Sequence, residues 1–249
     1  MFRYFIEVTY KGTFYAGYQV QENAVTIQSA LQEALAIFFK TEIQLTGSSR
    51  TDSGVHALQN FFHFDFEHEI PERKIYNLNA ILPKDIAIKS IKSVKADAHC
   101  RFDAVSRLYK YYIYDTKDPF LEDTAYYFPY KIDKDLLQQA AEMVKQYQDF
   151  TSFSKRNTQV NNFICNIIQS EWTHERNCLV YTVEANRFLR GMVRGLTGTM
   201  LQVARGKLTL DDFKQVIDSK DCSKADFSVP GHGLFLVKVN YPESVWSKL

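Results

Sequence analysis

The chain has 249 residues, of which 45% are hydrophobic and 14% aromatic, so it can form a folded core and is not an intrinsically disordered protein. The chain has 30 Lys and Arg residues and 29 Asp and Glu residues, which gives a net charge of +1. This charge is too small to attract a polyanion to the protein as a whole, so a nucleic-acid site must be a local basic patch. The four cysteines have no CxxC spacing, which argues against a zinc ribbon or a disulfide framework and favours a reducing compartment.

Predicted strands and helices alternate along the chain without a low-complexity linker or a short repeat. Aromatic and β-branched residues with period two predict strands, and apolar residues three and four apart predict helices. Most of the strands carry polar residues on one face, as antiparallel sheets do, so the expected fold class is α+β. In chain order we expect a strand over Phe2–Tyr10, a helix over Ile27–Phe39, strands over Phe61–Phe66 and Leu108–Tyr114, a helix over Lys134–Tyr147, a strand over Leu179–Ala185, helices over Leu189–Val203 and Leu210–Ile217, and a strand over Leu234–Tyr241.

The N-terminal stretch and the lengths of the apolar runs indicate where the protein is located. The N-terminal stretch MFRYFIEVTYKG alternates and includes Arg3 and Glu7, unlike a signal peptide, and the apolar runs are too short for a membrane span. We therefore expect a cytoplasmic protein without a membrane partner.

Each half of the chain offers strands that flank helices, so we expect an N-terminal domain over residues 1–105 and a C-terminal domain over residues 106–249.

The stretch RTDSGVHALQ, from Arg50 to Gln59, follows LTGSS and places one aspartate in a small, polar, turn-forming segment. Asp52 could form an Asx turn or a helix cap, ligate a metal, or act as a nucleophile or base beside Arg50. The residue types alone leave these three interpretations open.

The predicted helix over Leu189–Val203 has an apolar face and a basic face. Arg187, Arg190 and Arg194 fall at i, i+3 and i+7, and residues 185–208 include five basic residues and no acidic one. An ordinary solvated face usually mixes charges, so this pattern favours a phosphate-binding surface or a cation reserved for a buried carboxylate. The apolar face consists of Leu189, Met192, Val193, Leu196, Met200 and Val203.

Aromatic and basic residues also alternate in CRFDAVSRLYKYYIY, from Cys100 to Tyr114. In a strand, Tyr109, Tyr111 and Ile113 share one face. Such a stretch suits base stacking beside phosphate pairing, and it is equally compatible with a tyrosine-rich core strand that has a charged rim.

These stretches together resemble the TruA family of tRNA pseudouridine synthases over almost the whole chain, and RTD-x-GVH is the most specific of them. Tyr18, Ser53 and Cys100 depart from the family pattern, which usually has Trp, Ala and Ala at these positions. The matching stretches are YKGTFYAGYQ (Tyr10–Gln19), GSSRTDSGVHA (Gly47–Ala57), LNAILPKDIAI (Leu78–Ile88), AHCRFDAVSRLYKYYIY (Ala98–Tyr114), DFTSF (Asp149–Phe153), ANRFLRGMVRGLTG (Ala185–Gly198) and GLFLVKVNY (Gly233–Tyr241).

The resemblance implies a role for each candidate residue. Asp52 would be the nucleophile, and Arg194 would keep it ionised, because burial disfavours a charged carboxylate and a nearby arginine favours it. Tyr109 would stack on the extruded uracil and is the candidate for removing the C5 proton. Arg50 would fill the space that the base leaves or hold the adjoining backbone, and Leu234 would line the pocket.

The resemblance also implies fold and partners. The pseudouridine synthase fold has two α/β halves with antiparallel sheets that meet at a central active-site cleft. Its members are homodimers that bind tRNA, and Arg187 and Arg190 would contribute to substrate binding. His56 is interpreted as a hydrogen-bond partner that orders its loop. The six histidines lack metal-ligand spacing, so no metal and no cofactor are expected.

The expected function is therefore that of an isomerase, which converts uridine to pseudouridine at positions 38, 39 and 40 in the anticodon stem-loop of tRNA. Two alternatives remain open at this point. One is a pseudouridine synthase for another tRNA position or another RNA. The other is a non-catalytic tRNA-binding protein, against which a carboxylate in a phosphate site argues, because it would repel the ligand.

Overall fold

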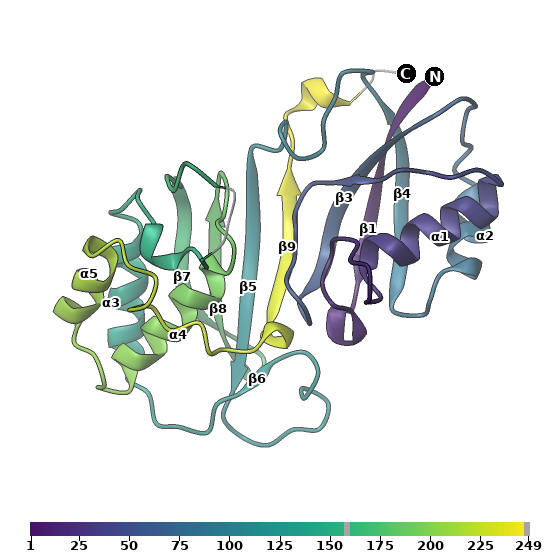
Figure 1. Ribbon diagram of the computed structural model, residues 1–249. Coiled ribbons are helices and arrows are strands. Elements are labelled where there is room, and N and C mark those ends of the chain that lie inside the picture. Colours follow the sequence, from purple (N-terminus) through teal and green to yellow (C-terminus); the bar gives the residue numbers. More distant parts are fainter. Residues whose placement is uncertain (157–159, 247–249) are drawn as a thin grey trace. The chain divides into compact units, whose positions relative to one another are not determined.

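A computed structural model describes residues 1–156 and 160–246 of the chain. The chain forms two compact units (Figure 1). The first contains Met1–Val105 together with the C-terminal segment from Phe235, and the second contains Ser106–Leu234. That two domains divide at residue 105 stays a prediction.

The first unit has a mostly antiparallel sheet with two helices. β1 (Phe2–Tyr10) pairs in antiparallel fashion with β3 (His56–Phe66) and β4 (Ile86–Val94). β9 (Leu234–Asn240) runs parallel to β3 through the pairs His56↔Phe235 and Ala57↔Leu236. The short β2 (Thr46–Gly47) pairs with β3. The order β4-β1-β3-β9 therefore brings the start of β3 next to β9.

The helices α1 (Ile27–Phe39) and α2 (Lys74–Ile81) pack against each other, and α2 also packs on β4 (Figure 1). α1 begins at a capping box in which Thr26 Oγ1 accepts from the Ser29 N–H. Its buried residues follow helical spacing, so this helix contributes an apolar face to the core of the unit. They are Ile27, Leu31, Ala34 and Leu35.

In the second unit, antiparallel strands follow the order β5-β8-β7. These strands are β5 (Ser106–Tyr114), β7 (Ile167–Glu175) and β8 (Cys178–Ala185), and the two-residue β6 (Tyr126–Tyr127) runs parallel to β5.

The helices of the second unit pack on one another and beside these strands (Figure 1). α3 (Lys134–Val144) contacts α4 (Met192–Ala204), α5 (Leu210–Asp218) and β7. The two units also contain short 3-10 helices, which are Gly12–Phe14 (η1), Thr151–Phe153 (η2), Gly231–Gly233 (η3) and Glu243–Val245 (η4).

The predicted α+β class is confirmed, and so are the bounds of β1 and α1. A capping box between Thr209 and Asp212 is present at the start of α5, where a helix was predicted. The longest helices, α1 and α4, have 13 residues each, and among the residues described none has the length and apolarity needed to cross a membrane.

The start predicted for the helix at Leu189 is wrong. α4 begins at Met192, after Gly191, whose φ of +76° is a left-handed conformation that interrupts a helix. Arg187 and Arg190 therefore do not lie on a helix face with Arg194, although the predicted apolar stripe is buried as expected.

Candidate active site

Asp52 lies in the loop between β2 and β3, and hydrogen bonds to buried groups hold this loop. The buried Asn60 amide donates from Nδ2 to Ser49 O at 3.0 Å and to the Tyr10 hydroxyl at 3.1 Å. The Tyr10 hydroxyl lies 2.9 Å from Thr51 Oγ1, and burial raises the pKa of Tyr10 to about 12, so it stays a neutral hydrogen-bonding group. Thr51, the residue before Asp52, is thus held by a hydrogen bond to a buried side chain.

A second segment, residues 12–18, closes over the same loop. The Tyr18 N–H donates to Thr51 O at 3.0 Å. Gly17 has φ +93°, and a Cβ there would lie 2.9 Å from Thr51 O. A Cβ on Gly12 would lie 2.0 Å from Val55 O. Only glycine allows these two close backbone approaches, which explains the spacing of the glycines in YKGTFYAGYQ.

The backbone of Asp52 itself closes a turn. Its carbonyl accepts from the Val55 N–H at 3.2 Å, and Gly54 within the turn has φ +76°. Asp52 is half-buried, while the neighbouring Arg50 is exposed. Because the backbone carbonyl closes this turn, the carboxylate need not serve that purpose.

His56 orders the end of the loop, as expected. Its side chain is 1% exposed, Nδ1 accepts from the Gly12 N–H at 3.0 Å, and the ring lies 4.5 Å from that of Phe235. A ring nitrogen that accepts a backbone hydrogen bond fixes the neutral tautomer with its proton on Nε2. This imidazole has a structural role in the first unit.

In the second unit, Tyr109 lies on β5 opposite Val183 of β8. It is buried, and its ring meets Phe188 edge to face, with centroids 5.0 Å apart and an interplanar angle of 82°. The predicted face of β5 is confirmed, since Tyr109, Tyr111 and Ile113 are all buried.

Arg194 lies in the first turn of α4, and backbone carbonyls hold its guanidinium. Nε donates to Val229 O at 2.8 Å, and an Nη group donates to Phe227 O at 3.4 Å. The chain around these carbonyls approaches α4 closely, because a Cβ on Gly198 would lie 2.2 Å from Asp226 O. The glycines of RGLTG therefore let this segment reach the arginine.

Leu234 follows the same segment and is buried. The Tyr111 hydroxyl donates to Pro230 O at 2.8 Å, and a Cβ on Gly233 would lie 2.8 Å from the Tyr111 ring. Burial raises the pKa of Tyr111, and the positive charge of Arg194 opposes this shift. Tyr111, for which the sequence indicated a strand face but no role, thus connects the surroundings of Arg194 and Leu234.

Arg187 and Arg190 lie in the loop between β8 and α4. Arg187 is half-buried. Burial raises the pKa of the Cys165 thiol to about 11, and the positive charge of Arg187 acts in the opposite direction. Arg190 is exposed, and its carbonyl accepts from the Lys155 N–H at 3.0 Å. The loop is thereby attached to residues near η2.

Of the predicted site residues, Asp52 and Arg50 belong to the first unit and the others to the second. The sequence missed the network of Tyr10, Thr51 and Asn60 that holds the loop of Asp52. In the sequence, the only available sign of this network was that these polar residues lie in or beside the motifs YKGTFYAGYQ and RTDSGVHALQ. The pairing of β1 with β3 is what brings them together. Within residues 1–156 and 160–246, no group of three or more His, Cys, Asp or Glu side chains is placed to hold a metal ion.

Comparison with known proteins gives a consistent picture. The family model described as tRNA pseudouridine synthase matches residues 7–103 and 143–242. The protein named tRNA pseudouridine synthase A of Parabacteroides distasonis is 47% identical over 99% of this chain and 98% of its own length. The proteins of the same name from Bacteroides fragilis and Bacillus subtilis are 45% and 38% identical over 98% and 94% of this chain, and 98% and 97% of their own lengths.

Proposed function

Because the chain belongs to the tRNA pseudouridine synthase family, we propose that it isomerises uridine to pseudouridine in the anticodon stem-loop of tRNA, at positions 38, 39 and 40. The observation that carries the proposal is the loop of Asp52. A carboxylate stands there on a backbone turn that Thr51, Tyr10 and Gly17 hold in place.

The reaction needs a nucleophile that bonds to the sugar or the base while the uracil is detached. The N1–C1′ bond breaks, the uracil turns, a C5–C1′ bond forms, and the bond to the nucleophile breaks again. C5 then loses its proton and N1 gains one, so substrate and product are isomers. Asp52 is the proposed nucleophile, and a rigid backbone at this residue supports the role because it keeps the carboxylate in one position.

Arg194 is the proposed cation that keeps this carboxylate ionised. The hydrogen bonds from its guanidinium to Val229 O and Phe227 O support the role. They fix a permanent positive charge on a helix that has no other charged residue, where a flexible lysine would be held less precisely.

Tyr109 is the proposed stacking residue for the extruded uracil, and its hydroxyl is the proposed acceptor of the C5 proton. The edge-to-face contact with Phe188 supports the role because it fixes the orientation of the ring. Leu234 would add apolar surface to the binding pocket, and the exposed Arg50 would hold the nucleotide backbone or fill the place of the base.

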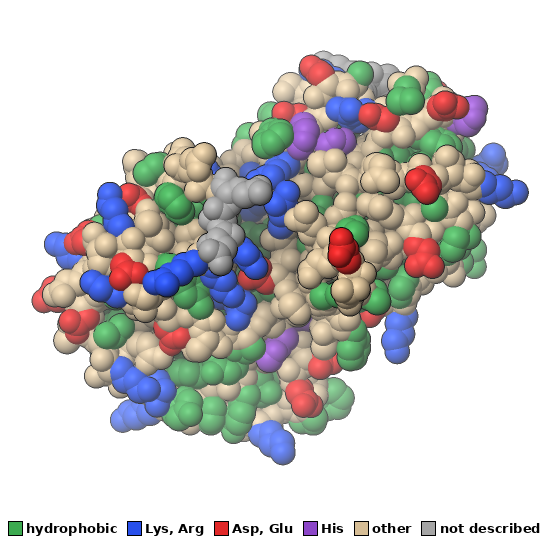
Figure 2. Space-filling view, in the orientation of Figure 1, with side chains coloured by type: hydrophobic (Ala, Val, Ile, Leu, Met, Phe, Trp, Pro, Cys, Tyr) green, Lys and Arg blue, Asp and Glu red, His purple; other side chains and the backbone are tan. Residues whose placement is uncertain are grey.

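The tRNA partner would be bound through local basic surfaces, because the chain as a whole carries only +1. Arg187 and Arg190 are proposed members of such a surface. Lys and Arg side chains appear on the face of the second unit that Figure 2 turns to the viewer. We further propose a cytoplasmic homodimer that binds one tRNA across both subunits, which sedimentation of the protein with and without tRNA would test.

The change of Asp52→Asn tests the proposed function. It removes the nucleophile and one negative charge, so tRNA binding should be equal or tighter while release of tritium from C5-labelled uridine in tRNA stops. Asp97→Asn is the matched control, since Asp97 is exposed in the same unit. Tritium release by Asp52→Asn at the control rate would show that Asp52 is not the nucleophile.

A further inference from the structure

A cavity of about 320 Å³ lies in the second unit, between the residues that follow η2 and the turn after α5. None of its lining residues has a role in the reaction described above. The lining side chains belong to Thr151, Ser154, Lys155, Arg156, Phe163, Lys220, Asp221 and Cys222.

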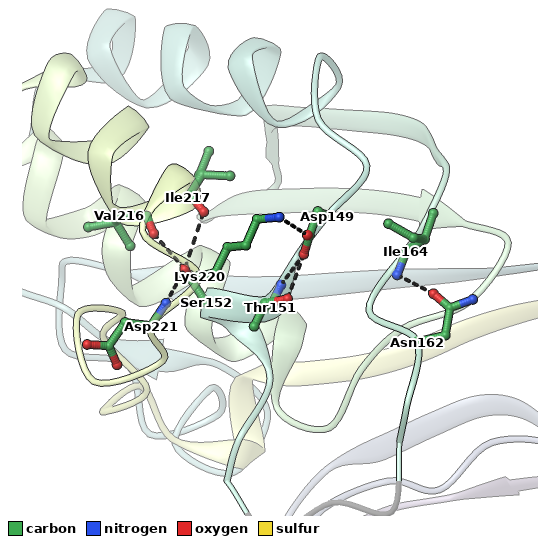
Figure 3. A network of polar contacts seen from close by, with 9 residues as sticks. All are labelled: Asp149, Thr151, Ser152, Asn162, Ile164, Val216, Ile217, Lys220 and Asp221. Carbon is green, nitrogen blue, oxygen red and sulfur yellow. Dashed lines mark hydrogen bonds and ion pairs between the residues drawn. The ribbon is translucent and has the colours of Figure 1, made fainter.

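A network of polar contacts fixes the frame of this cavity (Figure 3). Ser152 Oγ donates to Val216 O of α5 at 2.6 Å and accepts from the Asp221 N–H at 3.0 Å. The Asp149 carboxylate pairs with Lys220 Nζ at 2.8 Å. These contacts connect the segment around η2 to the end of α5 and the turn that follows it, so the two segments that border the cavity are held in place.

The lining of the cavity is positively charged. Lys155, Arg156 and Lys220 stand against two carboxylates, that of Asp221 in the lining and that of Asp149 paired with Lys220, and this leaves a charge of +1. The Asp221 carboxylate already accepts from the N–H and the hydroxyl of Ser223, at 2.9 and 2.8 Å. The cavity therefore favours an anion.

A buried hydroxyl gives independent evidence for a ligand. Ser154 borders the cavity and is only 4% exposed, and its buried Oγ has no hydrogen-bond partner among the described residues. A buried polar group without a partner is unfavourable. A phosphate at this end of the cavity would offer the Ser154 hydroxyl an acceptor.

The cavity is open to a ligand that continues beyond it. The Lys220 side chain is 63% exposed, and Arg156 is exposed as well. On another side, the Lys155 N–H donates to Arg190 O, which connects the cavity to the loop that leads into α4. The half-buried ring of Phe163 adds an apolar surface of the kind that a ribose or a base packs against.

We propose that this cavity binds a backbone phosphate of the tRNA outside the target nucleotide. The inference rests on the proposed function and extends it, because it assigns part of the tRNA contact to Lys155, Arg156 and Ser154. Each cation that meets a phosphate releases a counterion on binding, so each should contribute to the salt dependence of affinity.

Binding of an unmodified tRNA transcript at several salt concentrations tests these residues. Lys155→Gln and Arg156→Gln should each weaken binding about 3- to 10-fold and reduce the slope of log K against log salt by about one unit. Ser154→Ala should weaken binding about 2- to 5-fold without lowering the melting temperature, because it breaks no hydrogen bond to a described residue. Lys214→Gln, an exposed lysine on α5 outside the cavity, is the matched control and should change neither quantity.

The thiol of Cys222 reports directly on occupancy, since it lines the cavity and is half-buried while the other three cysteines are buried. The transcript should slow its alkylation by iodoacetamide at least 5-fold, and Lys155→Gln should remove most of this protection. Protection by inorganic phosphate but not by the transcript would overturn the proposal in favour of a small-anion site. No protection in a wild type that forms pseudouridine would overturn the inference alone, whereas a wild type that forms none would overturn the proposed function and, with it, the inference.

Discussion

At the scale of single residues, the three departures from the family pattern each have a specific contact in the first unit. Tyr18, where Trp is usual, stacks on Phe62 with ring centroids 5.1 Å apart and an interplanar angle of 16°. Ser53 donates from Oγ to Tyr15 O at 3.2 Å, and Cys100 donates from Sγ to a backbone carbonyl of β2 at 3.1 Å. These substitutions are accommodated by local packing and hydrogen bonding and remove no group of the proposed mechanism.

Tyr109 combines a ring and a hydroxyl whose roles can be separated. Tyr109→Phe keeps the ring, so tRNA affinity should stay within about twofold while proton removal from C5 slows by about 100-fold or more. Tyr109→Leu should lose both binding and turnover. Single-turnover tritium release and filter binding measure the two quantities, and Tyr112→Phe, on the other face of β5, is the control. A Tyr109→Phe enzyme as fast as this control would assign proton removal to another group.

His63 should make the first unit sensitive to acid. Burial, assisted by the charges of His99 and Arg3, lowers the pKa of His63 to about 4 from an ordinary 6.5, against the opposing effect of nearby carboxylates. Nδ1 accepts from the Cys100 N–H at 3.3 Å, an interaction of the neutral ring.

The sign of this effect follows from the two pKa values. Between pH 6.5 and 4 the unfolded chain binds the proton and the folded chain does not, so stability is complete above pH 6.5 and falls as the pH decreases. We expect a loss on the order of 1–2 kcal/mol, because solvent screens part of the charge. Urea unfolding at pH 7 and pH 4.5 should show a smaller loss for His63→Gln than for His68→Gln, an exposed control. Equal losses in the two variants would exclude this role.

At the scale of elements, α4 shows how a local conformation separates residues that a periodic pattern groups. Helical periodicity placed Arg187, Arg190 and Arg194 on one face. The left-handed Gly191 starts the helix after two of them, so only Arg194 lies on α4, where carbonyls of Phe227 and Val229 bind it. This division supports two different tasks for the basic residues.

Salt dependence should distinguish those tasks. Arg190→Ala should weaken binding of all tRNAs alike and reduce the slope of log K against log salt by about one unit, because it removes a phosphate contact. Arg194→Ala should leave the slope nearly unchanged and lower the single-turnover rate by at least 100-fold, because the proposed nucleophile loses its cation. Titrations of binding and rate against salt, with Lys214→Gln as the control, measure both. If Arg194→Ala behaved like Arg190→Ala, the two arginines would form one phosphate-binding surface and the proposed pairing with Asp52 would be wrong.

Other elements show which local signals suffice for prediction. β1 and α1 have the predicted bounds because a regular alternation and the capping box at Thr26 are local properties of the sequence. β4 was missed, and its pairing with β1 contains a register shift between Glu7 and Val8. α2 was missed because only Leu78 of this helix is buried, so its sequence carries little amphipathic signal.

At the scale of the whole molecule, the two units differ in how they gather distant parts of the chain. The first unit includes β9, more than a hundred residues beyond the rest of its chain, through a parallel pairing with β3 at His56 and Ala57. The second unit is continuous in sequence, and its core forms between β5, β8, β7 and helices α3, α4 and α5.

The sequence by itself determined the α+β class, most of the helices and strands, and the family, because periodicity, capping and motif spacing act over short distances along the chain. The roles proposed for Asp52, Tyr109 and Arg194 came from the resemblance to the family, because the residue types alone left several interpretations of Asp52 open. Only the tertiary structure decided which groups hold them: Asn60, Tyr10 and Thr51 around the loop of Asp52, and backbone carbonyls around Arg194. The physical reason is that these contacts join residues tens of positions apart through close glycine approaches and strand pairing, and no local pattern specifies which distant polar group will be the partner.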